Sequence, residues 1–265
     1  MYKLVVSDLD GTFLDDERKI PEKNIQAVRL MEEKGVMFAL ASGRSYHSLD
    51  GFYDALSLKG KGVCGIAFNG ACVYEIDTLK KIKTVLLDNA KMQTLTGMMR
   101  PFLKDIYVYG EDGTLYCEYE TDTFTGYRTR SRVPGELRDL REIKDGVVKI
   151  LLIDKYEVLS AVYERLVDYV PGVCNMFFSS KTMLEFTELS ATKGAALKTL
   201  CERLGVDISE TIAVGDNYND ESMVLAAGLG AVTANAEEEL KEKARYITGA
   251  SNNDGALMEI AETFL

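Results

Sequence analysis

Two aspartates near the N-terminus are the first side chains in this sequence whose type and spacing could do chemistry. Asp8 and Asp10 flank Leu9 and follow the apolar run 3–7, the pattern of a buried strand that ends in a loop. One such carboxylate can attack phosphorus, and its neighbour can transfer a proton to the leaving group. Because two anions would repel a phosphate, the pair also predicts a Mg²⁺ ion that bridges carboxylate and phosphate oxygens.

A third carboxylate is expected to join this pair from the other end of the chain. Asp216 lies in the polar segment 215–220, directly after the apolar run 211–214. Parallel strands of an open sheet present their C-terminal ends at one edge, so Asp216 can meet Asp8 and Asp10 although the sequence separates them widely.

Two further residues could bind the phosphate itself. Ser42 follows the predicted strand 36–41 and offers a hydroxyl and nearby backbone N–H groups at a helix start. Lys193 begins the predicted helix 193–204 and offers a cation between nucleophile and phosphate. Taken singly, each of these motifs is more often structural: an acidic segment is more often a turn, a serine such as Ser42 a helix start, and a lysine such as Lys193 a surface residue. Their order and placement favour one site.

The elements that must position these residues are parallel strands and helices at both ends of the chain. Buried strands are predicted over 3–7, 36–41, 65–68, 211–214 and 230–232. Helices are predicted from Pro21 to Gly35, from Ser45 to Leu56, and over 193–204, 221–227 and 237–244. Alternating patterns at 72–75 and 115–119 favour antiparallel pairing, and the predicted strands 148–153, 173–178 and 183–187 with a helix over 156–167 suit an α+β insert.

The chemistry-bearing segments resemble the four motifs of the haloacid dehalogenase-like superfamily, and in detail its Cof-type sugar-phosphatase branch. These segments are Asp8-Leu9-Asp10-Gly11-Thr12, Ala41-Ser42-Gly43-Arg44, Thr192-Lys193-Gly194 and Gly215-Asp216-Asn217-Tyr218-Asn219-Asp220, with Phe68-Asn69-Gly70-Ala71 and Asn252-Asn253-Asp254-Gly255 also similar. The resemblance implies an α/β fold. A Rossmann-like parallel-sheet core (1–85 and 186–265) would carry an inserted α+β cap (86–185) that acts as a substrate-selecting lid.

The resemblance also implies roles for individual residues. Asp8 would be the nucleophile and a metal ligand, Asp10 the general acid/base and a metal ligand through its carbonyl, and Asp216 a metal ligand. The implied phosphate-binding residues are Leu9, Ser42, Gly43, Lys193 and Asn219, the last binding phosphate or supporting the metal shell. Thr12 and Asp220 would support these loops. Arg44 either anchors its loop or contacts substrate, and loop support is favoured.

We therefore expect a Mg²⁺-dependent phosphatase that acts on a small phosphorylated metabolite, such as a sugar phosphate, through an aspartyl-phosphate. A phosphohexomutase is the alternative, because it would use the same core and differ only in excluding water from the aspartyl-phosphate intermediate. A non-catalytic Mg²⁺-binding sensor is a third interpretation. It would require a defect among Asp8, Asp10, Lys193 and Asp216, and the sequence shows none.

Composition narrows the class of partner. The formal net charge is −11 and no dense Lys/Arg run occurs, which argues against nucleic acid and anionic membranes as partners. Five cysteines without a pairing pattern suit a reducing compartment, and neither a signal segment nor a membrane-length apolar run is found. We expect a cytoplasmic protein that is a monomer or a weak homo-oligomer.

Overall fold

The chain passes back and forth between two structural units. The computed structural model describes residues 1–265. The core unit comprises Met1–Arg44, Asp50–Lys83 and Thr192–Leu265, and the cap unit comprises Ser45–Leu49 and Thr84–Ala191. Relative to the insert expected over 86–185, the cap unit extends a few residues further at each end and also takes Ser45–Leu49.

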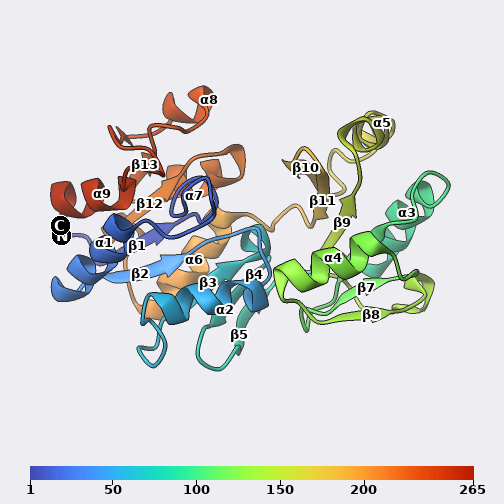
Figure 1. Cartoon of the computed structure of the whole chain (residues 1–265), viewed down its shortest axis with the longest axis horizontal. Coiled ribbons are helices and arrows are strands. Elements are labelled where there is room, and N and C mark those ends of the chain that lie inside the picture. Colours follow the sequence, from blue (N-terminus) through green and yellow to red (C-terminus); the bar gives the residue numbers. More distant parts are fainter. The chain divides into compact units, whose positions relative to one another are not determined.

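A parallel sheet forms the centre of the core unit (Figure 1). Its strand order is β14-β13-β12-β1-β2, and every neighbouring pair is parallel. The strands are β1 (Leu4–Ser7), β2 (Met37–Leu40), β12 (Thr211–Gly215), β13 (Leu229–Val232) and β14 (Tyr246–Ile247). Since β1 lies between β2 and β12, the loops that follow these three strands leave the same edge of the sheet. The predicted Rossmann-like arrangement is confirmed.

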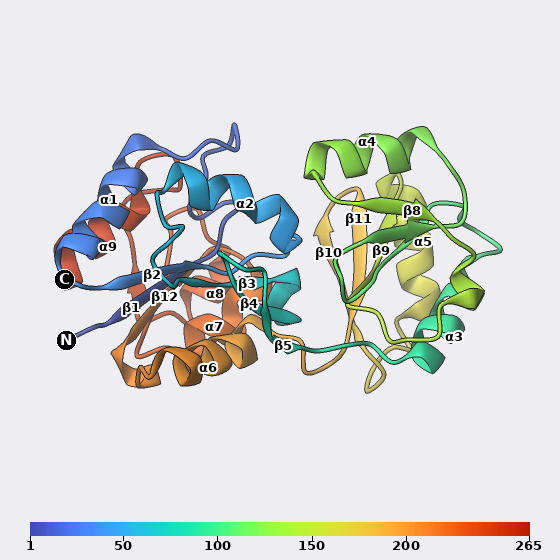
Figure 2. The ribbon, with the colours of Figure 1, turned by 90° about the horizontal axis from the view of Figure 1, so that it is seen from below.

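Helices cover both faces of this sheet (Figure 2). In that view α1 (Glu22–Glu33) and α9 (Ala256–Phe264) lie on one face, and α6 (Lys193–Leu204) and α7 (Glu221–Ala226) on the other. Two more helices are α2 (Tyr46–Ala55) and α8 (Glu238–Lys241). Along β1, Leu4 and Val6 alternate with Val5 and join the apolar cluster that contains Leu197 and Leu200 of α6. The side chains on one face of β1 thus pack against the helix that begins with Lys193.

Two sequence predictions for the core need correction. The predicted helix 237–244 is shorter, because Lys243 N–H bonds to Leu240 O only three residues back and tightens the chain after α8. The strand predicted over 65–68 is β3 (Cys64–Ala67), which pairs antiparallel with β4 (Cys72–Glu75) in a separate sheet that also contains β5 (Lys81–Thr84). One parallel bridge, from Ala41 to Ile66, links the residue after β2 to β3.

The cap unit is built on a six-stranded sheet of order β10-β11-β9-β6-β7-β8, antiparallel except for the pair β7 and β8. Its strands are β6 (Ile106–Tyr109), β7 (Leu115–Cys117), β8 (Gly135–Leu137), β9 (Lys149–Ile153), β10 (Asn175–Ser180) and β11 (Met183–Thr187). Its helices are α3 (Asn89–Met99), α4 (Asp122–Ser131) and α5 (Tyr156–Leu166). The expected α+β organisation is present, although the strand predicted over 173–178 begins later.

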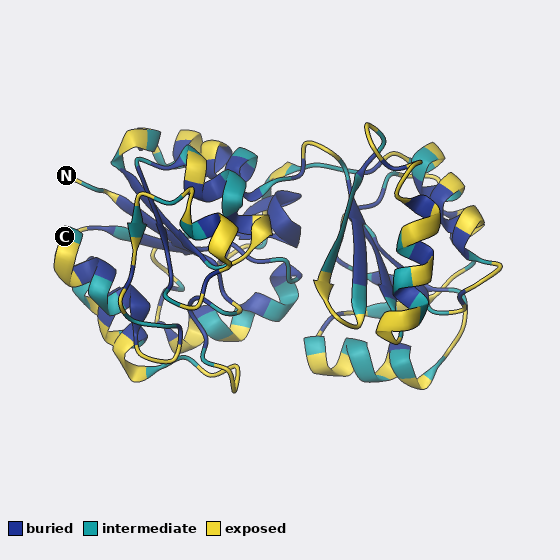
Figure 3. Cartoon of the chain, turned by 90° about the horizontal axis from the view of Figure 1, so that it is seen from above, coloured by how far each residue is buried: buried dark blue, intermediate teal, exposed yellow.

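The two faces of the cap sheet are covered differently. Side chains of α3 and α5, such as Met92 and Leu159, share one apolar cluster with Val108 and Ile150 of the sheet. On the opposite face the ring of Phe124 in α4 stacks on Tyr107 at a centroid distance of 5.9 Å. The inner strands of both units are buried (Figure 3). None of the helices has the length and apolar character needed to cross a lipid bilayer.

Candidate active site

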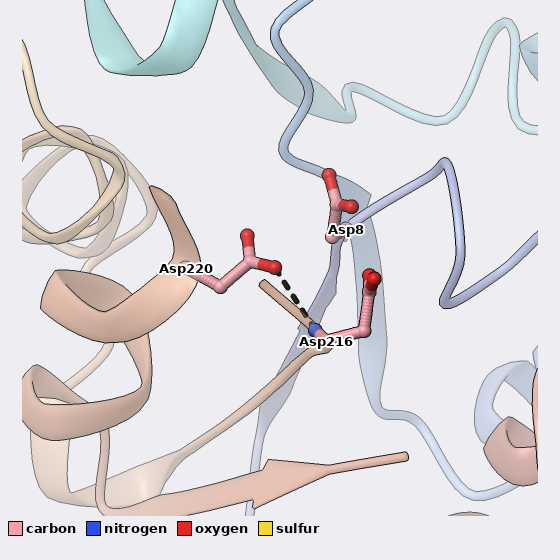
Figure 4. A group of neighbouring side chains, drawn as sticks. All are labelled: Asp8, Asp216 and Asp220. Atoms are coloured by element: carbon pink, nitrogen blue, oxygen red, sulfur yellow. Dashed lines mark hydrogen bonds between the residues drawn. The ribbon is translucent and has the colours of Figure 1, made fainter. Parts of the chain in front are cut away.

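Three acidic side chains converge where β1 and β12 end (Figure 4). Asp8 directly follows β1, Asp216 directly follows β12, and Asp220 lies in the next turn. The N–H of Asp8 bonds to the carbonyl of Val214 at 2.8 Å, which continues the ladder between the strands past the end of β1. Carboxylate oxygens of the three aspartates lie within 4.8 Å of one another. The carboxylate of Asp10 is outside this group.

Lys193 lies between two of these carboxylates. Its Nζ atom is 2.5 Å from Asp8 Oδ1 and 2.5 Å from Asp220 Oδ1, and its side chain is fully buried. Thr192 fixes the helix start by accepting the N–H of Ala195 at its hydroxyl. The ammonium group is therefore held by its own helix and by two anions.

Asp220 organises the loop that carries Asp216. Its Oδ2 accepts the backbone N–H groups of Asp216 at 3.0 Å and Asn217 at 3.1 Å, while Oδ1 accepts from Lys193. Because both oxygens of this fully buried carboxylate are occupied by donors, Asp220 orients Asp216 and completes the charge pattern around Lys193.

Burial and mutual repulsion shift the acidity of these groups. Burial raises the pKa of Asp8 well above its ordinary value, the charge of Asp220 raises it further, and Lys193 opposes both. Burial and the charge of Asp220 raise the pKa of Asp216 to about 7. For Lys193 burial lowers the pKa, but Asp220 and Asp8 outweigh it and hold the pKa above the ordinary lysine value.

These charges are unbalanced. Three carboxylates surround one ammonium group, so the buried site carries an excess of negative charge when all are ionised. Closely spaced carboxylate oxygens are the ligands that a hard divalent cation such as Mg²⁺ prefers. The donor set therefore fits Mg²⁺ chemically.

The loop after β1 is held against Asp216. The hydroxyl of Thr12 donates to Asp216 Oδ1 at 2.6 Å. Gly11 has a φ of +82°, and a Cβ atom there would lie 2.4 Å from Asp216 Oδ2. Only glycine allows this turn and this close approach, so Gly11 and Thr12 together set the spacing between the two aspartate loops.

The candidate phosphate-binding residues lie on neighbouring loops of the core. Ser42 is buried, its N–H bonds to the carbonyl of Ile66, and its hydroxyl accepts the N–H of Arg44 at 3.2 Å. A Cβ atom on Gly43 would lie 2.9 Å from Asn69 Nδ2. The Nδ2 of Asn219 donates to Asn69 Oδ1 at 3.0 Å.

Leu9 lies within the first of these loops. Its side chain is buried, and its carbonyl accepts the N–H groups of Phe13 and Leu14. The loop after β1 is therefore closed on itself as well as tied to Asp216, and the backbone of Leu9 is held beside Asp8.

Two asparagines near these loops have contacts that the sequence pattern did not reveal. Asn69 accepts from Asn219 and thereby links two candidate motifs. Asn235, in the loop after β13, donates to the carbonyl of Gly11 at 2.8 Å and accepts the N–H of Asn252 at 2.9 Å. Segment 68–71 at least resembled a family pattern, whereas no local periodicity marks Asn235.

The comparison with known families decides what kind of enzyme carries this site. A sequence profile of haloacid dehalogenase-like hydrolases matches residues 5–260, which is nearly the whole chain. This chain belongs to the haloacid dehalogenase-like hydrolase family. The match includes the segments that carry the convergent aspartates and the buried lysine.

Relatives with known structures share this fold over their full length. A haloacid dehalogenase-like hydrolase from Bacteroides thetaiotaomicron is 27% identical, with a TM-score of 0.87 and complete coverage of both chains. The Thermotoga maritima protein TM0651 is 30% identical, with a TM-score of 0.86 and coverage of 100% of this chain and 98% of the other.

Some curated relatives carry a substrate in their names. The 5-amino-6-(5-phospho-D-ribitylamino)uracil phosphatase YcsE of Bacillus subtilis is 27% identical over 258 residues, which covers 97% of this chain and 94% of that protein. Together with the family match, this similarity makes the present haloacid dehalogenase-like chain a phosphatase.

Proposed function

We propose that this haloacid dehalogenase-like enzyme is a Mg²⁺-dependent phosphatase that hydrolyses small phosphomonoesters through an aspartyl-phosphate on Asp8. The observation that carries the proposal is the buried contact of Lys193 with Asp8 and Asp220, beside Asp216. An excess of buried negative charge is costly, and a bound divalent cation would offset it and supply positive charge for phosphoryl transfer.

The residues proposed to hold Mg²⁺ are Asp8, Asp216 and the carbonyl of Asp10. When bound, Mg²⁺ would neutralise charge on the transferring phosphoryl group and orient its oxygens. Thr12 and Asp220 would keep Asp216 in place for this, through the hydrogen bonds described above.

In the first step a carboxylate oxygen of Asp8 forms a bond to phosphorus while the bond from phosphorus to the ester oxygen breaks. Lys193 already bonds to Asp8 Oδ1, which leaves Oδ2 for the attack. Asp10 donates a proton to the departing alkoxide, so that the product leaves as a neutral alcohol. Ser42, Gly43, Asn219 and Lys193 would bind the remaining phosphate oxygens.

In the second step Asp10, now ionised, takes a proton from water while the water oxygen bonds to phosphorus. The bond from phosphorus to Asp8 breaks, and inorganic phosphate and the carboxylate of Asp8 are regenerated. The same two aspartates thus serve both halves of the reaction, and Asp10 must be accessible to alcohol and to water in turn.

The proposed substrates are small polar phosphomonoesters, with sugar phosphates as the first candidates. The named substrate of YcsE joins a phosphorylated sugar alcohol to a heterocycle, which supports a metabolite of this size. We also propose that the cap unit selects the leaving group, because the core residues named above would contact only the phosphoryl group and its metal ion. Phosphoproteins would then be poor substrates.

A phosphate-release screen of the purified full chain tests this function. Sugar phosphates, nucleotides, flavin mononucleotide and pyridoxal phosphate would be offered with Mg²⁺, with excess chelator, and with Ca²⁺. We expect release with Mg²⁺, none with chelator, and inhibition by Ca²⁺, whose looser shell would misplace Asp8. Full turnover in chelator would remove the metal from the proposal, and isomer formation without phosphate release would identify a mutase.

A further inference from the structure

The guanidinium group of Arg44 binds the carboxylate of Asp10 through two parallel contacts. Arg44 Nε is 2.8 Å from Asp10 Oδ2, and Arg44 Nη2 is 2.5 Å from Asp10 Oδ1. This is the fork geometry that arginine, unlike lysine, offers to a carboxylate. Both oxygens of the candidate acid/base are therefore held in one plane.

Arg44 is itself fixed at three points within the core unit. Its guanidinium carbon lies 5.4 Å from the ring centroid of Phe52. Its N–H donates to Ser42 Oγ, and its carbonyl accepts the N–H of Phe68 at 2.9 Å. A guanidinium group anchored in this way can impose a direction on Asp10 rather than follow it.

The contact with Arg44 also distinguishes the Asp10 carboxylate from the other carboxylates of the site. Asp8, Asp216 and Asp220 form the buried group, whereas Asp10 is turned to Arg44 and its side chain is 49% exposed. A group that exchanges protons with an alcohol and then with water must be both open and oriented. Exposure alone would leave the Asp10 carboxylate free to rotate, and the fork removes that freedom.

We propose that Arg44 is a positioning residue for the reaction. It fixes the plane of the Asp10 carboxyl group for proton transfer and keeps that carboxyl group from rotating toward the buried group of three carboxylates. This inference rests on the proposed phosphatase function. The bidentate contact occupies one lone pair on each oxygen and leaves another on each for the proton. Arg44 thus acts through Asp10 and does not itself exchange a proton with the substrate.

A leaving-group comparison separates this role from simple loop support. The variants are Arg44→Gln, which loses the charge, and Arg44→Lys, which keeps the charge but loses the fork. Arg203→Gln is the matched control, because Arg203 makes an exposed ion pair with Glu75 in the same unit at 2.8 Å. Each would be assayed for kcat/KM on a sugar phosphate and on an aryl phosphate, whose good leaving group needs little protonation.

Both Arg44 variants should lose about 10- to 100-fold on the sugar phosphate, short of the roughly 10²–10⁴-fold that general acid–base catalysis contributes. On the aryl phosphate the loss should stay within about threefold, and Arg203→Gln should change neither. In an Asp10→Asn background the further effect of Arg44→Gln should shrink to within about twofold, since a residue that acts only through Asp10 has nothing left to position.

Equal losses on both substrates, or an undiminished effect of Arg44→Gln in the Asp10→Asn background, would overturn the proposal in favour of a phosphate contact or loop support. Melting temperatures check that each variant folds, and Arg44→Lys decides the matter if Arg44→Gln does not fold. A wild-type chain that released no phosphate from any substrate would instead refute the function itself, so the two failures are distinguishable.

Discussion

Each unit of this protein buries one lysine against carboxylates, and the two arrangements differ in their charge balance. In the cap unit Lys149 Nζ lies 3.0 Å from Glu185 Oε2, with both side chains at most 5% exposed, and 5.5 Å from the ring centroid of Tyr109. The formal charges of this pair cancel. In the core unit Lys193 meets Asp8 and Asp220 while Asp216 stands beside them.

The difference shows which kind of buried charge indicates a catalytic site. A neutral pair such as Lys149 with Glu185 can be satisfied within the protein and can serve packing or specificity of the fold. The surplus of carboxylates around Lys193 is not neutralised by protein groups. Burial first, and the charge of Asp220 second, raise the pKa of Asp8 and of Asp216. Ionisable groups with shifted pKa values are concentrated at catalytic sites.

The largest effect should come from replacing the attacking carboxylate. Asp8→Asn keeps the shape of the side chain but removes the nucleophile, so kcat should fall by more than about 10⁴-fold and no phosphoenzyme should form. The variant should still fold, because it relieves repulsion within the acidic group. Steady-state kinetics with a melting curve would check this, and near-normal turnover would refute covalent catalysis.

The two lysines can be compared directly by substitution. Lys149→Met and Lys193→Met should each lower the free energy of unfolding by about 3–5 kcal/mol, because each leaves a buried carboxylate without its cation. Pairing Lys149→Met with Glu185→Leu should restore much of that stability and retain turnover. Lys193→Met paired with Asp220→Leu should regain stability without turnover.

Denaturant titrations and phosphate release would measure both outcomes of this comparison. If Lys149→Met abolished turnover at unchanged stability, the cap pair would belong to the chemistry and the contrast between the two units would fail. If the Lys193→Met, Asp220→Leu double variant kept wild-type turnover, the core lysine would be structural.

Stability in chelator should depend on pH through Asp216. Its folded-state pKa of about 7 lies above the ordinary aspartate value, so its destabilising contribution is absent near pH 4, grows between about pH 4 and 7, and is complete above that range. Asp216→Asn should therefore match wild type near pH 4 and exceed it above pH 7 by up to about 4 kcal/mol. A stability gap that stayed constant with pH would show that Asp216 is not held as an unneutralised buried acid.

The smallest effect should come from Thr12. Thr12→Val removes the hydrogen bond to Asp216 Oδ1 and should raise the Mg²⁺ concentration for half-maximal activity by about 10-fold, with little change in kcat at saturating Mg²⁺. Thr182→Val, in an exposed turn of the cap unit, is the control. An unchanged Mg²⁺ requirement would mean that this hydroxyl does not orient the ligand.

Local patterns sufficed for much of the fold. The apolar run before Asp8 predicts β1, and the helix predicted from Lys193 to Leu204 has the bounds of α6. Strand ends at a common sheet edge also predict that Asp8, Asp10 and Asp216 meet. Asp8 and Asp216 do so, whereas the Asp10 carboxylate contacts Arg44 instead. These features follow from periodicity, which is a local property of the sequence.

The pairing of individual side chains between loops could not be predicted in this way. The fork of Arg44 on Asp10 and the double contact of Asn235 with Gly11 and Asn252 depend on how loops pack after the strands are in place. No local signal encodes them, because polar loop residues look alike in sequence whether they face solvent or another loop.

Trapping the phosphorylated enzyme tests the central claim most directly. Wild-type protein would be mixed with Mg²⁺ and an aryl phosphate, quenched in acid at successive times, and digested for mass spectrometry. The account requires one added phosphoryl group on the peptide that contains Asp8, removable by hydroxylamine and absent from Asp8→Asn. Turnover of the same substrate without phosphorylated Asp8 at any quench time would contradict it.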